Sequence, residues 1–151
     1  MLDSKEESWV YTIRFVEEMP SHNPVWTHWA RFLLPLLQEC VRLGLDRYFR
    51  AGQSISDIII SASEKHGLER YQPPPPRVTI RFDREKAQWF IAWSHHLLFS
   101  MLPERQMPVE AETAFEVLRS NLVDLWKETH PGELLPEPLA KRGPDEQGIT
   151  S

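Results

Sequence analysis

The sequence predicts an α+β fold: a small antiparallel or mixed three-stranded sheet packed with about three helices, in the order β-α-α-β-β-α. Three observations favour this class. Two segments alternate apolar and polar residues, as strands do, and others repeat apolar residues every three or four positions, as helices do. Four prolines at 73–76 separate a mainly helical first half from a strand-bearing second half. Because proline has no amide hydrogen to donate, this run is expected to be an extended connector within one domain.

The first strand is expected at residues 9–15. The segment is rich in β-branched and aromatic residues, and its large side chains recur at every second position. This is the period of a half-buried strand. The side chains expected on one face are Trp9, Tyr11, Ile13 and Phe15.

A helix is expected from about residue 24 to 43. Asn23 and Pro24 resemble a cap followed by proline at the first helical position, and a stripe of apolar residues follows at helical spacing. Pro35 falls inside the stripe, so the helix should bend or split near Phe32.

A second helix is expected to begin at Ser54 and to end near Gly67, with apolar residues at helical spacing as far as Ala62. Ser54 followed three residues later by Asp57 resembles a capping box. The competing interpretation is a strand at residues 57–61, because three consecutive isoleucines favour β structure.

Two strands are expected after the prolines. Residues 77–83 alternate apolar and polar side chains, and a polar turn follows from Asp83 to Lys86. Residues 88–99 are apolar on both faces, which suits a central strand. A helix capped by Asp83 is the alternative for this segment, but a strand followed by a short polar turn favours a hairpin.

The last helix is expected to begin at Pro108 and to end before Pro131 and Gly132. Its early glutamates suit the positive end of a helix dipole, and its apolar residues recur at helical spacing. Residues 133–151 are rich in proline, glycine and charge without periodicity. The sequence therefore predicts a single domain at residues 1–132 and a flexible, disordered tail at 133–151.

Charge and cysteine content narrow the expected partners and compartment. The net charge is −5 and basic residues form no block, so nucleic acid is not an expected partner. The longest apolar run, 32–37, is too short to cross a bilayer, and the first eight residues lack the apolar stretch of a signal peptide. The single cysteine, Cys40, cannot form an internal disulfide. We expect a cytoplasmic protein that does not bind membranes.

Sequence motifs for catalysis and metal binding are missing. The chain has no Gly-x-Ser-x-Gly, no His-Glu-x-x-His, no Cys-x-x-Cys and no glycine-rich phosphate loop. His95 and His96 are neighbours, so they cannot both hold one ion in regular β geometry. Cys40 lies in an apolar helical stripe, where a thiol stays neutral and unreactive. No catalytic residue, metal or cofactor is therefore predicted, and an enzyme is disfavoured.

A well-formed core without a catalytic motif favours a function in binding. We expect an acidic protein-protein interaction module, such as an adaptor, an inhibitor or an immunity-type protein. A homodimer is a further alternative. Tryptophan is enriched at interface hot spots. The residues expected to bind the partner are Trp26, Trp29, Trp93 and His95. The alternative is a small-ligand-binding protein or a His-dependent enzyme, with a pocket around Trp89, Trp93, His95 and His96.

Overall fold

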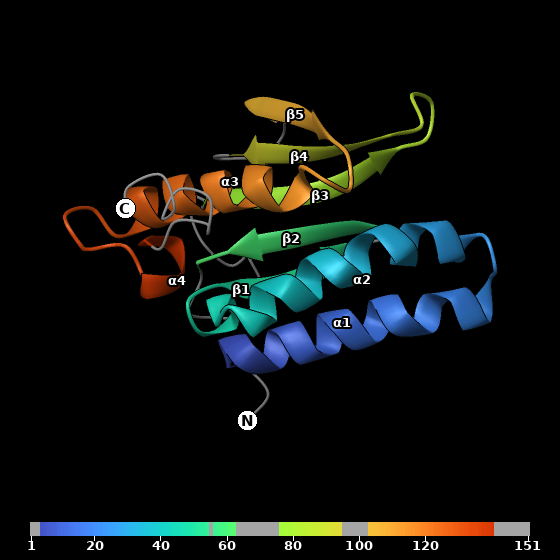
Figure 1. Cartoon of the computed structure of the whole chain (residues 1–151), viewed down its shortest axis with the longest axis horizontal. Coiled ribbons are helices and arrows are strands. Elements are labelled where there is room, and N and C mark those ends of the chain that lie inside the picture. The colour runs from blue at the N-terminus through green and yellow to red at the C-terminus, as the bar shows by residue number, and fades with distance from the viewer. Residues whose placement is uncertain (1–3, 55, 63–75, 95–102, 141–151) are drawn as a thin grey trace, which may run out of the picture.

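The computed structural model describes residues 4–54, 56–62, 76–94 and 103–140. Within these ranges the chain is α+β, with four α-helices, one 3-10 helix and a five-stranded antiparallel sheet (Figure 1). In chain order the elements are α1 (Lys5–His22), α2 (Trp26–Arg42), η1 (Leu45–Arg47), β1 (Arg50–Ser54), β2 (Asp57–Ser61), β3 (Arg77–Asp83), β4 (Gln88–Ser94), β5 (Arg105–Val109), α3 (Ala114–Thr129) and α4 (Glu137–Ala140).

The sheet is a meander in which each strand pairs with the next one along the chain. Figure 1 shows α1 and α2 side by side next to β1 and β2, while α3 lies along β3 and β4. The apolar faces of α1, α2 and α3 join one sheet face in a single core. The strand residues buried in this core include Ile58, Ile60, Val78, Ile80, Trp89, Ile91 and Trp93.

The expected three-stranded sheet and the order β-α-α-β-β-α are therefore wrong. The observed order is α-α-β-β-β-β-β-α, followed by the single turn of α4. The general class, α+β, is confirmed. Three local misassignments account for the difference, and each has a physical cause.

The strand expected at residues 9–15 lies inside α1. A capping box starts this helix: the amide of Glu7 donates to Ser4 Oγ (3.0 Å), and the amide of Ser4 donates to the Glu7 carboxylate (3.4 Å). Trp9, Thr12 and Val16, three or four residues apart, form the buried face. The alternation of large side chains is real, but the pattern of burial has the helical period.

The helix expected at residues 54–62 is replaced by the β1–β2 hairpin. Ser54 pairs with Asp57 in the β1–β2 ladder, so these two residues belong to a hairpin and do not cap a helix. Ile58 and Ile60 are fully buried and face the core, whereas Ile59 lies on the other sheet face and is half-buried. The strand interpretation of residues 57–61 is the correct one, because β-branched side chains suit a sheet covered by helices.

The last helix begins at Ala114 rather than at Pro108. Pro108 lies in β5 opposite Phe90. Since β5 is the final strand of the sheet, proline is tolerated there. The residues between β5 and α3 form a connection in which the amide of Glu110 donates to Thr113 Oγ1 (3.2 Å).

Two further expected elements are confirmed where the structure describes them. The helix expected at 24–43 is α2, which spans 26–42; it runs through Pro35 as one continuous helix, so the split expected near Phe32 does not occur. The hairpin expected from residue 77 is β3–β4; its turn is held by Asp83 Oδ1, which accepts from the amides of Glu85 (2.9 Å) and Lys86 (3.1 Å). β4 is followed to Ser94, so the expected continuation to residue 99 lies outside the described residues.

Residues 73–75 of the proline connector and residues 141–151 of the expected tail lie outside the described residues. The first part of that tail, residues 133–140, packs on α3: Leu139 is buried, and Arg119 donates to its carbonyl at 2.5 Å. Trp126 Nε1 donates to the carbonyl of Leu134 (3.0 Å).

Candidate functional site

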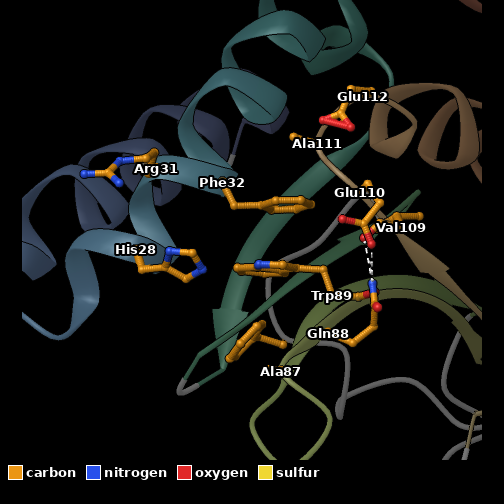
Figure 2. Close-up of a pocket in the computed structure, with 11 residues that line it drawn as sticks. His28, Arg31, Phe32, Ala87, Gln88, Trp89, Val109, Glu110, Ala111 and Glu112 are labelled. Atoms are coloured by element: carbon orange, nitrogen blue, oxygen red, sulfur yellow. Dashed lines mark hydrogen bonds between the residues drawn. The ribbon is translucent and has the colours of Figure 1, made fainter.

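A cleft of about 300 Å³ opens between three parts of the fold. One wall comes from α2, the floor from the β3–β4 hairpin, and the other wall from the connection between β5 and α3 (Figure 2). We call it the aromatic cleft. Its lining residues are His28, Arg31, Phe32, Phe82, Ala87, Gln88, Trp89, Val109, Glu110, Ala111 and Glu112.

Stacked aromatic rings line the aromatic cleft where the α2 wall meets the hairpin floor. The rings of Phe32 and Trp89 lie parallel with centroids 4.1 Å apart and an interplanar angle of 8°. Phe82, which pairs with Trp89 across the hairpin, packs at 5.2 Å on the same indole. Trp89 is buried, whereas Phe32 and Phe82 remain half-buried and border the cavity. This part of the cleft is therefore apolar, and each of its rings packs against another.

Two carboxylates belong to the wall between β5 and α3. Gln88 Nε2 donates to the carbonyl of Val109 (2.9 Å) and to Glu110 Oε2 (3.2 Å), which ties this connection to the hairpin (Figure 2). Glu110 and Glu112 are both exposed. Figure 2 shows them on the side of the stacked rings away from His28 and Arg31.

The opposite wall is the face of α2 that carries His28, Arg31 and Phe32. Their spacing of three and four residues places them on one helix face. His28 packs edge-on against Phe82 with centroids 6.2 Å apart, and its ring points toward the aromatic pair (Figure 2). The guanidinium of Arg31 points away from the rings in the same view, and the side chain is exposed.

The structure distributes the sequence-predicted site residues over different environments. Trp29 is buried, and its Nε1 donates to the carbonyl of Ser56 (2.9 Å). Trp26 is half-buried and packs edge-on against Trp29 at 5.1 Å. Trp93 is buried beneath the guanidinium of Arg105, 5.1 Å from the ring centroid. His95 lies outside the described residues.

The pocket residues of the alternative hypothesis are also separated. Trp89 lines the aromatic cleft and Trp93 does not. His95 and His96 both fall outside the described ranges. The other lining residues, which the sequence did not mark as a site, come from three segments that are distant in the chain, at residues 28–32, 82–88 and 109–112. No local pattern signals that these segments meet, because the sheet register and the placement of α2 bring them together.

A second hollow of about 230 Å³ lies beside α1. Burial raises the pKa of Asp46 at its edge, and the nearby charge of Glu6 raises it further. Val10 and Tyr11 on α1 are exposed by 54% and 47%. The residues lining this hollow are Glu6, Trp9, Val10, Ile13, Arg14, Glu17, Val41 and Asp46.

The thiol of Cys40 lies in the core of the protein. Cys40 is fully buried, and burial raises the pKa of its thiol, so the thiolate needed for nucleophilic attack is disfavoured. Among the described residues, no group of three or more histidine, cysteine, aspartate or glutamate side chains could hold a metal ion. In the same part of the chain, no helix has the length and apolar character to cross a membrane.

Comparison of the chain with protein-family models, with curated proteins and with solved structures finds no match.

Proposed function

We propose that this chain is a protein-binding module whose contact surface is centred on the aromatic cleft. The observation that supports the proposal is the arrangement of the cleft itself: half-buried aromatic rings surrounded by exposed charged residues. Protein interfaces have this anatomy, with an apolar centre and a polar rim. Aromatic residues that are held rigidly by their neighbours also make favourable anchoring points for a partner.

The size of the cleft supports the insertion of one side chain from a partner. Its volume of about 300 Å³ is small, whereas pockets for drug-sized molecules usually extend well above this value. A stable protein complex needs further contacts around such a pocket, because about 800 Å² per partner is a standard contact area. The exposed charged residues of both walls provide a surface on which those contacts can form. An adaptor, an inhibitor or an immunity-type protein works in this way.

The experiment is a capture assay with a variant that fills the cleft. Ala111 is exposed and lines the cleft, so Ala111→Phe should occupy the cavity without removing a core contact. Ser120→Phe, at an exposed position of α3 outside the cleft, is the matched control. A specific partner should be recovered from a lysate of the source cells with the wild type and with Ser120→Phe. Its recovery should fall about tenfold or more with Ala111→Phe, as hot-spot disruption predicts.

Circular dichroism is needed to show that both variants fold. A partner recovered equally with Ala111→Phe would contradict the proposal, as would the absence of any partner that distinguishes the two variants. The binding should also weaken with added salt, because exposed charges at the rim are screened.

A second candidate function is the binding of a small ligand in the same cleft. The observation that favours it is the ring of His28, which points into an aromatic recess of about 300 Å³, the lower limit of small-molecule pockets (Figure 2). Saturation-transfer NMR with mixtures of metabolites tests it. A signal from one compound that disappears in Ala111→Phe would favour this function over protein binding.

A second copy of the chain is the alternative partner, and sedimentation at several concentrations should show whether a dimer forms. We place the protein in the cytoplasm, because its single cysteine is a buried free thiol. Fractionation of source cells tests the compartment, and recovery outside the cytoplasm would contradict it.

A further inference from the structure

The charges around the aromatic cleft are unequal. Glu110 and Glu112 stand on one wall, and both are exposed. Gln88 donates to Oε2 of Glu110, which orients this carboxylate without neutralising it. On the other wall Arg31 is the charged residue, and its guanidinium points away from the rings (Figure 2). The carboxylates therefore dominate the potential next to the stacked rings.

The aromatic rings of the cleft also favour a positively charged group. The face of an aromatic ring carries partial negative charge and attracts a cation placed over it. This chain uses such contacts elsewhere: the guanidinium of Arg105 lies 5.1 Å from the Trp93 centroid, and Lys86 Nζ lies 5.5 Å from that of Phe90. Phe32 and Phe82 border the cleft as half-buried rings. A cation in the cleft would meet ring surface and carboxylate together.

From this combination we infer that the aromatic cleft receives a cationic side chain, an arginine from a basic segment of a partner protein. The inference rests on the proposed function and specifies the chemistry of the partner. The net charge of −5 complements a basic partner over a longer range and speeds their encounter.

Arginine fits the cleft better than lysine does. Its planar guanidinium stacks on aromatic rings and offers a fork of N–H donors that matches a carboxylate in two hydrogen bonds. A lysine ammonium is compact and more strongly hydrated, so it gains less from a partly apolar recess. An arginine-containing peptide should therefore bind more tightly than its lysine counterpart.

Short peptides provide the test. We would titrate acetylated and amidated Gly-Xaa-Gly peptides, with arginine, lysine, leucine or glutamate at Xaa, into the full-length protein. Binding is followed by NMR through the indole N–H of Trp89 and the amides of Val109 and Glu110. The arginine peptide should shift these resonances and bind most tightly, with the lysine peptide second.

Charge-neutral variants then test whether the two carboxylates cause the preference for the arginine peptide. Glu110→Gln combined with Glu112→Gln keeps the side-chain shape and an oxygen that can accept from Gln88, and it should weaken the arginine peptide about tenfold. Glu104→Gln combined with Glu133→Gln makes the same change in net charge at exposed positions outside the cleft and should have little effect. Arg31→Ala removes the opposing cation and should strengthen binding, by about twofold to threefold.

The outcomes separate this inference from the proposed function. Equal or tighter binding of the leucine or glutamate peptide would overturn the inference, and so would weaker binding of the arginine peptide by Arg31→Ala. In those cases the cleft would remain a binding site of different chemistry. If no peptide shifts the cleft resonances, the inference is also overturned. The capture assay with Ala111→Phe then decides separately whether the cleft binds a protein.

Discussion

Replacing Trp9 by phenylalanine tests the link between the helical layer and the sheet. Trp9 is fully buried in α1, and its Nε1 donates to the carbonyl of Phe49 at 2.8 Å, just before β1 begins. Ser8 next to it accepts from the amide of Ala51 (3.0 Å). These contacts join two segments about forty residues apart, and Trp9→Phe removes one of them while keeping an aromatic ring.

The expected loss follows from two contributions. Phe49 is fully buried, so water cannot replace the lost donor, and an unsatisfied buried carbonyl costs about 1–3 kcal/mol. The smaller ring also leaves a void in the core, which costs about 1–2 kcal/mol for a few missing atoms. Together they predict that the free energy of unfolding falls by about 3 kcal/mol, equivalent to a drop in Tm of roughly 6–12 °C.

Urea denaturation followed by far-UV circular dichroism measures the effect. Trp26→Phe is the matched control, because Trp26 is only half-buried and should lose about 1 kcal/mol or less. If Trp9→Phe costs no more than this control, the indole hydrogen bond does not hold α1 on the sheet. The far-UV circular dichroism spectrum also tests α1 itself. A protein with a strand at residues 9–15 would show a weaker helical signal than one with α1, because α1 supplies a large part of the helix.

Three other substitutions test separate features of the fold. Ala87 has φ of 50° in the β3–β4 turn, so Ala87→Gly should raise the free energy of unfolding by about 1 kcal/mol in urea denaturation; a loss would contradict this backbone strain. Arg105 pairs with Asp124 (2.6 Å) and covers Trp93, so Arg105→Ala should cost about 1 kcal/mol, an effect that shrinks in high salt because the pair is half exposed. Burial raises the pKa of Asp57 above its ordinary value of 3.8, with Arg81 opposing, so the folded state holds this proton more tightly than the unfolded chain. The stabilisation from that proton is complete below pH 3.8 and is lost as pH rises through the folded pKa; Asp57→Asn should therefore remove this pH dependence, and an unchanged stability-pH profile would refute it.

Sequence patterns were sufficient where local preference and tertiary environment agree. α2 is recognisable because its apolar stripe is long and strongly helical, and the β3–β4 hairpin because alternation is followed by a turn that Asp83 can hold. The main body of α3 follows from the same reasoning. In each case the apolar side chains that the pattern marks are buried in the core or packed against it as half-buried residues.

Sequence patterns predicted the wrong secondary structure where the same local pattern suits both a helix and a strand. Residues 9–15 alternate in size as a strand does, yet Tyr11 is exposed and Trp9 is buried, because the capping box at Ser4 commits the segment to a helix. Ser54 and Asp57 have the spacing of a helix cap, yet they pair across a hairpin. For residues 9–15 the deciding feature is a cap that lies just before the segment, and for residues 57–61 it is strand pairing with β1 and β3.

The sequence by itself determined the α+β class, the acidic charge, the absence of familiar catalytic motifs and several of the longer elements. These properties depend on composition or on patterns within a dozen residues. Only the tertiary structure decided the five-stranded meander and the aromatic cleft, because Phe32, Trp89 and Glu110 meet through strand pairing and helix packing. Contacts between residues so far apart leave no periodic trace in a single sequence, since each segment is compatible with many partners until the chain has folded.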